Sequence, residues 1–291
     1  MILVTSAAGR TGRAVLAALA SRGAAARALV HRDAQAEAVR AAGARDVAAG
    51  DLLDAASLRR ALDGVDAIYH VCPNMSPHEV EIGRAMMDAA RTAGVRRFVF
   101  HSALHAQTEK MPNHWHKMRV EELLFETGLD YTILQPTAYM QNVVAVWQTI
   151  VEEGIYRVPY SAATRIGMVD LRDVAAVAAR VLIEPGHVGA TYELAGPDVL
   201  TQDEISAVLA DVLGRPVRAE RIPLDVWARG AGALGLGPYQ IDAMSKLFRY
   251  CEQYGLWGNA RVLGWLLDRP ATGFRAFVED FCAAPAPSAG R

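Results

Sequence analysis

The sequence predicts an α/β fold in which helices cover both faces of a doubly wound parallel sheet. In residues 1–135, apolar runs of four or five residues alternate with longer stretches of helical periodicity. Strands that are buried on both faces are continuous apolar runs, and right-handed βαβ crossovers arrange them as a Rossmann-type sheet. Beyond residue 135 the alternation loosens. We therefore expect a Rossmann-type core, 1–135, followed by a smaller, mainly helical subdomain, 136–291.

The core elements follow in chain order, with a helix between successive strands. The strands are predicted at residues 2–5, 26–30, 46–49, 67–71, 98–101 and 131–134. The helices are predicted at residues 12–22, 33–42, 57–62, 77–93 and 115–127. This order brings the carboxyl ends of the strands to one edge of the sheet, where open α/β folds bind their ligands.

Helix signals predict most of the second part of the chain. A helical segment is expected over 140–153, and Asp173 is expected to cap a helix at 174–183. Thr201 and Glu204 have the spacing of a capping box ahead of an apolar run. These signals place helices on both sides of residue 200.

Three longer stretches complete the prediction. Segments within 165–198 are expected to return to the Rossmann-type core. Residues 223–282 are expected to be mostly helical, and the tail 283–291, which contains two prolines and a glycine, is expected to be frayed.

The composition is that of a folded protein with no electrostatic preference for polyanions. Of 291 residues, 52% are hydrophobic, and 30 Lys and Arg stand against 32 Asp and Glu, for a formal net charge of −2. This balance predicts neither a nucleic-acid partner nor binding to an anionic membrane, and no run approaches the roughly 20 apolar residues of a membrane span. Three widely spaced cysteines and a start without a basic leader favour a cytoplasmic location, and the oligomeric state is left open.

A glycine-rich turn joins the first predicted strand to the first predicted helix. Its motif has the spacing of GxxGxxG, with the first glycine replaced by serine. Such a turn lets backbone N–H groups approach a diphosphate, and the helix N-terminus adds partial positive charge. We therefore predict that the turn binds a dinucleotide. The candidate contacts are Ser6, Ala8, Gly9, Arg10, Thr11 and Gly12.

The end of the second strand distinguishes between the nicotinamide cofactors. NAD-dependent enzymes usually place an acid there, and it binds the ribose 2′-hydroxyl. Here the strand ends in His31 and Arg32, and no acid precedes Asp33. A guanidinium can bind a 2′-phosphate and stack on adenine, with Arg10 in support. These residues favour NADP(H), with NAD(H) as the alternative.

Two further strand ends carry candidate cofactor contacts. Asp51, followed by Leu52, closes the third strand, where a carboxylate can accept from the adenine amino group or simply form a turn. Cys72 and Pro73 follow the fourth strand, beside the expected nicotinamide position. We expect Cys72 to be a small buried residue rather than a nucleophile.

These motifs together resemble those of the NmrA-like branch of the atypical short-chain dehydrogenases/reductases. The matching segments are 4–12, 28–32, 50–52, 97–102, 117–124, 128–136, 139–142 and 169–173. The resemblance covers roughly residues 1–215. It implies an NAD(P)-binding core and a C-terminal substrate-binding region. It also implies either a reductase of the quinone or isoflavone type or a non-catalytic redox sensor.

The sequence departs from this superfamily at the catalytic pair. Short-chain reductases use Tyr-x-x-x-Lys, in which the lysine holds the nicotinamide ribose and lowers the tyrosine pKa. Lys117 fits the lysine, but Asn113 stands four residues before it. His114 shares the helix face of Lys117, so its imidazole is a candidate replacement for the phenol. The candidate catalytic residues are Lys117, His114, His101, Ser102 and Tyr139.

Aromatic residues are concentrated in the later part of the chain. Of the 21, only Tyr69 precedes residue 98, and all five tryptophans follow residue 114. Helical packing and a pocket for a flat aromatic ligand explain this distribution equally well. For the second explanation, the candidate lining residues are Asn74, Met75, Tyr139, Met140, Trp147 and Trp227.

The expected function is that of an NAD(P)H-dependent oxidoreductase acting on a flat aromatic or quinonoid molecule, whose reduction needs little help from an acid. A tailoring role in secondary metabolism, for example on aromatic polyketides, fits the arginine- and alanine-rich composition. The alternatives are a non-catalytic NADP-binding regulator and, more distantly, an oxygenase-like enzyme. Six of the eight histidines lie between residues 70 and 116, but their spacing does not complete a metal site.

Overall fold

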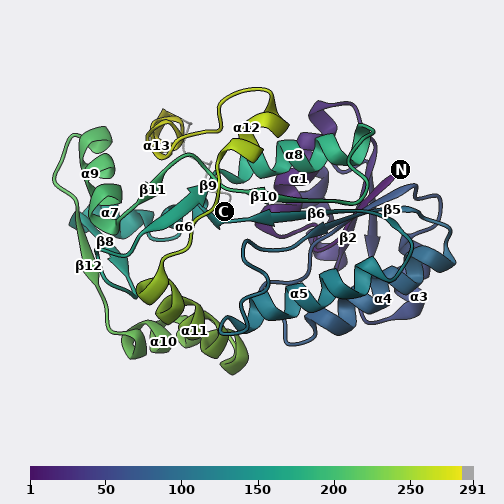
Figure 1. The fold of residues 1–291 in the computed structure, drawn as a ribbon, viewed down its shortest axis with the longest axis horizontal. Helices are drawn as coiled ribbons and strands as arrows, with labels where there is room; N and C mark the ends of the chain where they lie inside the picture. The colour runs from purple at the N-terminus through teal and green to yellow at the C-terminus, as the bar shows by residue number, and fades with distance from the viewer. Residues whose placement is uncertain (284–291) are drawn as a thin grey trace.

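The computed structural model describes residues 1–283. A seven-stranded sheet forms the centre of the Rossmann-type core (Figure 1). Its strands are parallel and lie in the order β10-β6-β5-β4-β1-β2-β3. Their bounds are β1 Ile2–Val4, β2 Ala26–Val30, β3 Asp46–Ala49, β4 Ala67–His70, β5 Arg97–His101, β6 Asp130–Pro136 and β10 Ala190–Leu194. From β1 the chain adds β2 and β3 on one side, and then returns to add β4, β5, β6 and β10 on the other side. This is the strand order of a doubly wound sheet, so the predicted fold class is confirmed.

Helices cover both faces of this sheet (Figure 1). The helices of the core are α1 Arg10–Ser21, α2 Ala36–Ala41, α3 Ala55–Ala61, α4 Glu79–Thr92, α5 Pro112–Phe125, α8 Leu171–Ile183 and α12 Arg261–Leu267. α1, α8 and α12 lie on one face, and α3, α4 and α5 lie on the other. Two apolar cores result, one containing Leu16 and Val177 and the other containing Ile68, Met86 and Phe98.

The remaining elements form a second lobe beside the core (Figure 1). One of its sheets has the order β11-β9-β7, and another pairs β12 with β8. The strands are β7 Ala138–Tyr139, β8 Ile155–Val158, β9 Ile166–Val169, β11 Val199–Leu200 and β12 Arg218–Arg221. The helices are α6 Gln141–Val144, α7 Trp147–Glu153, α9 Gln202–Leu213, α10 Leu224–Ala233, α11 Pro238–Tyr254 and α13 Phe274–Ala283. A third apolar core, which includes Ile150, Leu209 and Phe274, holds this lobe together.

The start of α8 differs from the prediction. The helix begins at Leu171, and Asp170 caps it by accepting a hydrogen bond from the Arg172 N–H at 2.8 Å. Asp173, the predicted cap, lies in the first turn, where its carboxylate pairs with Arg269 and accepts from the Thr272 N–H at 2.7 Å. The prediction of Asp173 as the cap is therefore wrong, because a partner distant in the sequence binds this carboxylate.

Other elements also differ from their predicted boundaries. The helix expected over 140–153 is interrupted at Ala145 and Val146, which separate α6 from α7. Segment 165–198 divides between two sheets, because β10 extends the core sheet whereas β9 pairs with β7 and β11. The capping box is confirmed, since Thr201 Oγ1 accepts from the Glu204 N–H at 3.1 Å and Glu204 Oε2 accepts from the Thr201 N–H at 2.8 Å.

Two further expectations concern the C-terminal tail and membrane spans. Of the tail 283–291, only Ala283 belongs to the described residues, and it is the last residue of α13. None of the helices within residues 1–283 combines the length and the apolar character needed to cross a membrane.

Candidate functional site

The glycine-rich turn between β1 and α1 leaves no room for side chains on its inner side. A Cβ placed on Gly12 would lie 2.6 Å from the Ala7 Cα and 2.8 Å from the Ser6 carbonyl oxygen, which are backbone atoms that cannot move aside. Gly9 caps α1 without any side-chain acceptor, so the first N–H groups of the helix remain available to a ligand. The turn is therefore shaped to receive an anion at the helix N-terminus.

The serine in place of the first glycine gives a second indication. Ser6 has a positive φ of 45°, and its hydroxyl is buried without a hydrogen-bond partner among the described residues. Leaving a buried hydroxyl unpaired costs about 1–3 kcal/mol, which a ligand oxygen would offset. Together with the uncapped helix, this hydroxyl fits the diphosphate of a dinucleotide.

The ends of β2 and β3 place two predicted cofactor contacts at the surface. Arg32 is exposed, and its backbone N–H, like that of His31, donates to Gln35 Oε1 at 3.1 Å. Asp51 Oδ1 accepts from the Leu53 N–H at 2.9 Å, so the carboxylate forms a turn and keeps one oxygen for other contacts. Leu52 is buried in the core beneath them.

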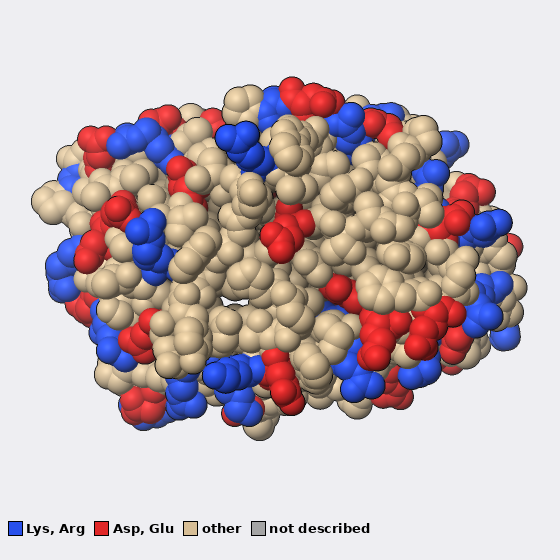
Figure 2. Space-filling view, viewed as in Figure 1, with Lys and Arg blue, Asp and Glu red and all other residues tan. Residues whose placement is uncertain are grey.

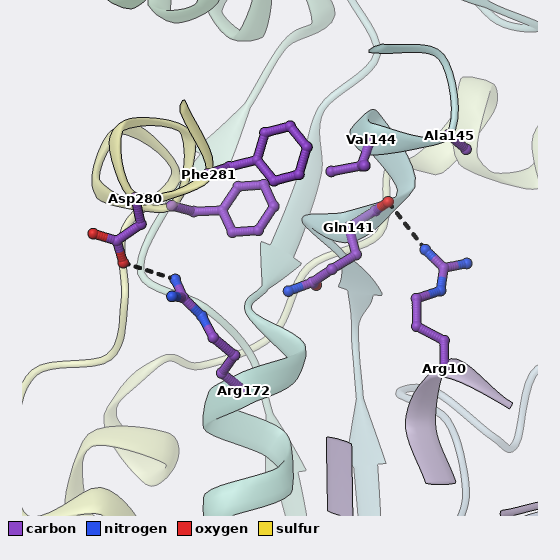
Figure 3. A pocket seen from close by; sticks show the side chains of 8 residues that line it. Arg10, Gln141, Val144, Ala145, Arg172, Asp280 and Phe281 are labelled. Carbon is purple, nitrogen blue, oxygen red and sulfur yellow. Dashed lines mark hydrogen bonds and ion pairs between the residues drawn. The ribbon is translucent and has the colours of Figure 1, made fainter. Parts of the chain in front are cut away.

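Arg10 extends from the turn toward the second lobe. Its Nη1 donates to the backbone carbonyl of Gln141 at 3.0 Å, across a cavity of about 460 Å³ (Figure 3). Phe277 and Phe281 also line this cavity. Gln141 is itself fixed, because its Nε2 donates to Asp170 Oδ1 at 2.8 Å. The turn and the lobe are thus joined beside the predicted diphosphate position.

A buried chain of three polar side chains runs from β4 to β7. The Tyr69 hydroxyl is hydrogen-bonded to His101 Nδ1, and His101 Nε2 lies 2.6 Å from the Tyr139 hydroxyl. Burial, with the nearby positive charge of Lys117, lowers the pKa of His101 to about 3, so its imidazole is neutral. Burial raises the pKa of Tyr139 to about 12, although the Thr11 hydroxyl and Arg10 act in the opposite direction. Sequence analysis missed the contribution of Tyr69.

Lys117 is held by a buried carboxylate that sequence analysis also missed. Its Nζ donates to Glu79 Oε1 at 2.8 Å and to the His101 carbonyl oxygen at 3.2 Å. The Glu79 side chain is 3% exposed and the Lys117 side chain 15% exposed. The ammonium also lies 5.5 Å from the centroid of the Phe100 ring. Lys117 of α5 therefore lies against the carboxyl end of β5, with Glu79 as its counter-ion.

Two other predicted catalytic residues have partners of their own. Ser102 donates its hydroxyl proton to Glu121, which also accepts from Gln135 Nε2 at 2.9 Å. His114 Nδ1 is bonded to the Leu104 carbonyl oxygen at 2.8 Å, and burial lowers the pKa of this histidine to about 4. Neither residue is hydrogen-bonded to the series Tyr69–His101–Tyr139.

Three of the six predicted pocket residues pack elsewhere. Met140 is completely buried in the core of the second lobe, so the prediction that it lines a pocket is wrong. Trp147 packs edge-to-face on Phe281 with centroids 4.8 Å apart, and Trp227 packs in the same way on Phe248. These contacts support helical packing as the main reason for the aromatic residues.

The loop after β4 approaches helix α11. Cys72 is buried, and burial raises the pKa of its thiol, as expected for a structural cysteine; Pro73 after it is exposed. The Asn74 carbonyl oxygen accepts from Gln240 Nε2 at 3.1 Å, and Met75 has a positive φ of 51°. This loop and α11 therefore border the same edge of the sheet.

Helix α11 is also fastened to α5. Tyr239 stacks on His116 with centroids 6.1 Å apart and an interplanar angle of 4°, and its hydroxyl lies 3.1 Å from His116 Nδ1. Figure 2 shows the face of the molecule that is seen in Figure 1. A hollow lies near its middle, with a small opening through the molecule and mostly uncharged residues around it. Within residues 1–283, no group of three or more His, Cys, Asp or Glu is arranged to hold a metal ion.

Comparison with known proteins finds relatives that span nearly the whole chain. Residues 1–273 match the model of the NmrA-like family. The NAD(P)H azoreductase of Xenophilus azovorans is 32% identical over 98% of this chain and 99% of its own length. Quinone oxidoreductase 2 of Escherichia coli (strain K12) is 29% identical over 94% of this chain and 95% of its own length.

A solved structure extends the comparison to three dimensions. The NADPH-dependent quinone oxidoreductase of Escherichia coli, crystallised with NADPH, superposes with a TM-score of 0.82 and 28% sequence identity. The superposition covers 97% of this chain and 99% of that one. The core and the second lobe are therefore both shared with that protein.

Proposed function

The chain belongs to the NmrA-like family and is an NAD(P)H-dependent oxidoreductase of this type, and from that premise we propose that it reduces flat aromatic or quinonoid molecules. The observation that carries the proposal is the polar cradle at the β1–α1 turn, where the Ser6 hydroxyl and the first N–H groups of α1 have no partner among the described residues. That cradle lies at the same sheet edge as Lys117 and Tyr139, which are the groups suited to act on a substrate.

NADP(H) is the cofactor that the residues fit. The turn 6–12 would hold the diphosphate, and Arg32 at the end of β2 would bind the 2′-phosphate. Lys117 would hold the nicotinamide ribose. When bound, NADPH supplies a hydride, and the remaining steps concern the residues that orient the substrate and deliver a proton.

Two observations support a flat, uncharged substrate. The hollow between α11 and the strand ends is bordered mostly by uncharged residues (Figure 2). The stacked rings of His116 and Tyr239 lie where α11 crosses to α5, next to the loop that contains Asn74. The named substrates of the relatives, azo compounds and quinones, are of the same chemical class.

The test is a turnover assay that follows the absorbance of the reduced nicotinamide with a panel of acceptors. The panel contains a benzoquinone, an azo dye and an anthraquinone of the polyketide type, because a tailoring role predicts turnover of the last. We expect oxidation of NADPH to depend on the acceptor. Binding of NADP⁺ and NADPH without turnover of any acceptor would instead support the regulator. Oxygen consumption coupled to substrate conversion would support the oxygenase.

Replacement of Arg32 should change the cofactor preference. We expect Arg32→Glu to weaken NADPH binding by roughly 10- to 100-fold, the effect of losing a charged hydrogen bond, while NADH binding changes little. Calorimetric titration with both nucleotides measures the ratio. The matched control is Arg45→Glu, which makes the same charge change at an exposed position before β3, at the opposite end of the strands. Equal NADPH affinity in the parent and in Arg32→Glu would exclude the assigned role.

A further inference from the structure

We propose that Tyr139, positioned by His101, donates the proton that completes the reduction, in place of the tyrosine that Asn113 replaces. The inference rests on the proposed function, because it assigns a residue to the same site. Three features support it. Tyr69, His101 and Tyr139 are linked by hydrogen bonds, the neutral His101 ring carries its proton on a defined nitrogen, and the other candidate donors are already hydrogen-bonded to other groups.

Tyr139 lies between the two parts of the site. It is half-buried on β7, with Thr11 of the glycine-rich turn near its hydroxyl and His101 Nε2 at 2.6 Å. The carbonyl of the same His101 accepts from Lys117 Nζ at 3.2 Å, so the phenol and the lysine flank one residue. A group bound between the turn and Lys117 would therefore lie beside the Tyr139 hydroxyl.

The hydrogen bonds of Tyr69 determine which imidazole nitrogen carries the proton. The Tyr69 side chain is fully buried, and its hydroxyl has His101 Nδ1 as its partner among the described residues. If Nδ1 carried the proton, the Tyr69 hydroxyl proton would be buried without an acceptor, at a cost of about 1–3 kcal/mol. Tyr69 therefore donates to Nδ1, and Nε2–H donates to the Tyr139 oxygen. This arrangement leaves the Tyr139 proton directed toward the site.

The other candidate donors are occupied. The Ser102 proton is donated to Glu121, and His114 is bonded through Nδ1 to the Leu104 carbonyl oxygen. Both side chains are at most 5% exposed. Tyr139 is thus the candidate that is half-buried, accepts a hydrogen bond from His101 and keeps its own proton for the substrate.

The proton balance of the step is simple. Two-electron reduction of an azo bond or a quinone adds one hydride and one proton to the substrate. The Tyr139 O–H bond breaks as the N–H or O–H bond of the product forms, which leaves a phenolate. His101 Nε2–H donates to that phenolate and stabilises it. Water returns the proton to Tyr139 after the product has left. His101 is a positioning residue, since it touches Tyr139 and not the substrate.

A pair of acceptors tests the donor. A cationic triphenylmethane dye becomes neutral when it takes a hydride and needs no proton, whereas an azo dye needs one. In Tyr139→Phe we expect the ratio of the azo rate to the cationic-dye rate to fall at least about 100-fold, the usual contribution of a general acid. The matched control is Tyr192→Phe, which removes a hydroxyl bonded to His187 Nδ1 at 3.0 Å on β10, away from the site, and should preserve the ratio. An unchanged ratio in Tyr139→Phe would overturn the assignment.

Variants of His101 separate positioning from bulk packing. His101→Gln can present an amide N–H near the position of Nε2, so the ratio should partly recover, whereas His101→Leu should behave like Tyr139→Phe. If Gln and Leu give the same ratio as the parent, the imidazole has no positioning role. Thermal melting of each variant checks that it is folded.

A measurement on the cofactor-free protein is independent of turnover. Nitrogen NMR of the histidine rings should show a neutral His101 with the proton on Nε2, and the proton should move to Nδ1 in Tyr69→Phe. A parent protein with the proton on Nδ1 would contradict the inference. If the parent turns over none of the acceptors, the proposed function fails. If the parent does turn over the azo dye and the azo ratio is unchanged in Tyr139→Phe, only this inference fails.

Discussion

Replacing Lys117 with methionine should destabilise the protein by about 3 kcal/mol or more and also abolish tight dinucleotide binding. The variant leaves the Glu79 carboxylate, 3% exposed, without the ammonium that lies 2.8 Å away. Removing one partner of a buried ion pair typically costs about 3–5 kcal/mol, because the remaining charge is desolvated and unpaired. Urea unfolding at neutral pH measures the loss of stability, and calorimetric titration with NADPH measures binding.

A double variant separates these two effects. Lys117→Met combined with Glu79→Gln removes both charges, so most of the lost stability should return while NADPH binding stays weak. The matched control is Arg119→Met on the same helix, which breaks an exposed pair with Glu122 at 3.0 Å and should leave both measurements unchanged. If the double variant regains NADPH affinity as well, Lys117 has no role at the ribose.

The free energy of unfolding should fall steeply below about pH 6. His70, His101 and His114 are at most 5% exposed, and burial lowers their pKa values to about 3, 3 and 4. The folded protein keeps them neutral, whereas the unfolded chain protonates them near the ordinary pKa of about 6.5. Because the unfolded state then binds more protons, stability is present above the unfolded pKa and is lost as the pH falls toward the folded values.

The magnitude follows from the number of protons. Each histidine contributes about 1.4 kcal/mol per pH unit, so three give about 4 kcal/mol per unit between roughly pH 5.5 and 4. Burial raises the pKa of Glu121, which offsets part of this loss because the folded state then holds a proton more strongly. Urea unfolding from pH 7.5 to 4 measures the slope.

A single variant provides the control for the acid effect. His114→Gln keeps a donor for the Leu104 carbonyl but cannot titrate, so the slope should decrease by about a third. A free energy of unfolding that is constant from pH 7 to 5 in the parent would contradict the assignment of three neutral buried histidines.

The sequence contains enough local information for the core strands and the turn. Apolar runs and the spacing of Ser6, Gly9 and Gly12 are short-range features, and each of the six predicted strands is within two residues of its predicted bounds, whereas β10 was not predicted. Lys117 was chosen from the Tyr-x-x-x-Lys pattern of the resembling superfamily, which is also a short-range feature, and its role at the ribose stays a prediction. These features are predictable since the local chain alone determines them.

The rest of the site depends on pairs that are far apart in the sequence. Glu79 precedes Lys117 by 38 residues, and Tyr69 precedes His101 by 32, so no spacing rule connects them. Asp173 was chosen as a helix cap because Asp170 and Asp173 both satisfy the local pattern. The choice between them is made by Arg269, 96 residues away, which pairs with the second carboxylate. Such partners require the tertiary structure.

The attachment of α11 to α5 and to the loop after β4 has a kinetic consequence. The fastening consists of one ring stack between Tyr239 and His116, with its hydrogen bond, and the bond from Gln240 to Asn74. A few partly exposed contacts of this kind break and re-form without unfolding the lobe, on the microsecond-to-millisecond scale of segment motions. We therefore expect product departure, and not the chemical step, to limit the overall rate for large dyes. Small quinones, which need less opening of this attachment to leave, should turn over at a rate that solvent viscosity affects less.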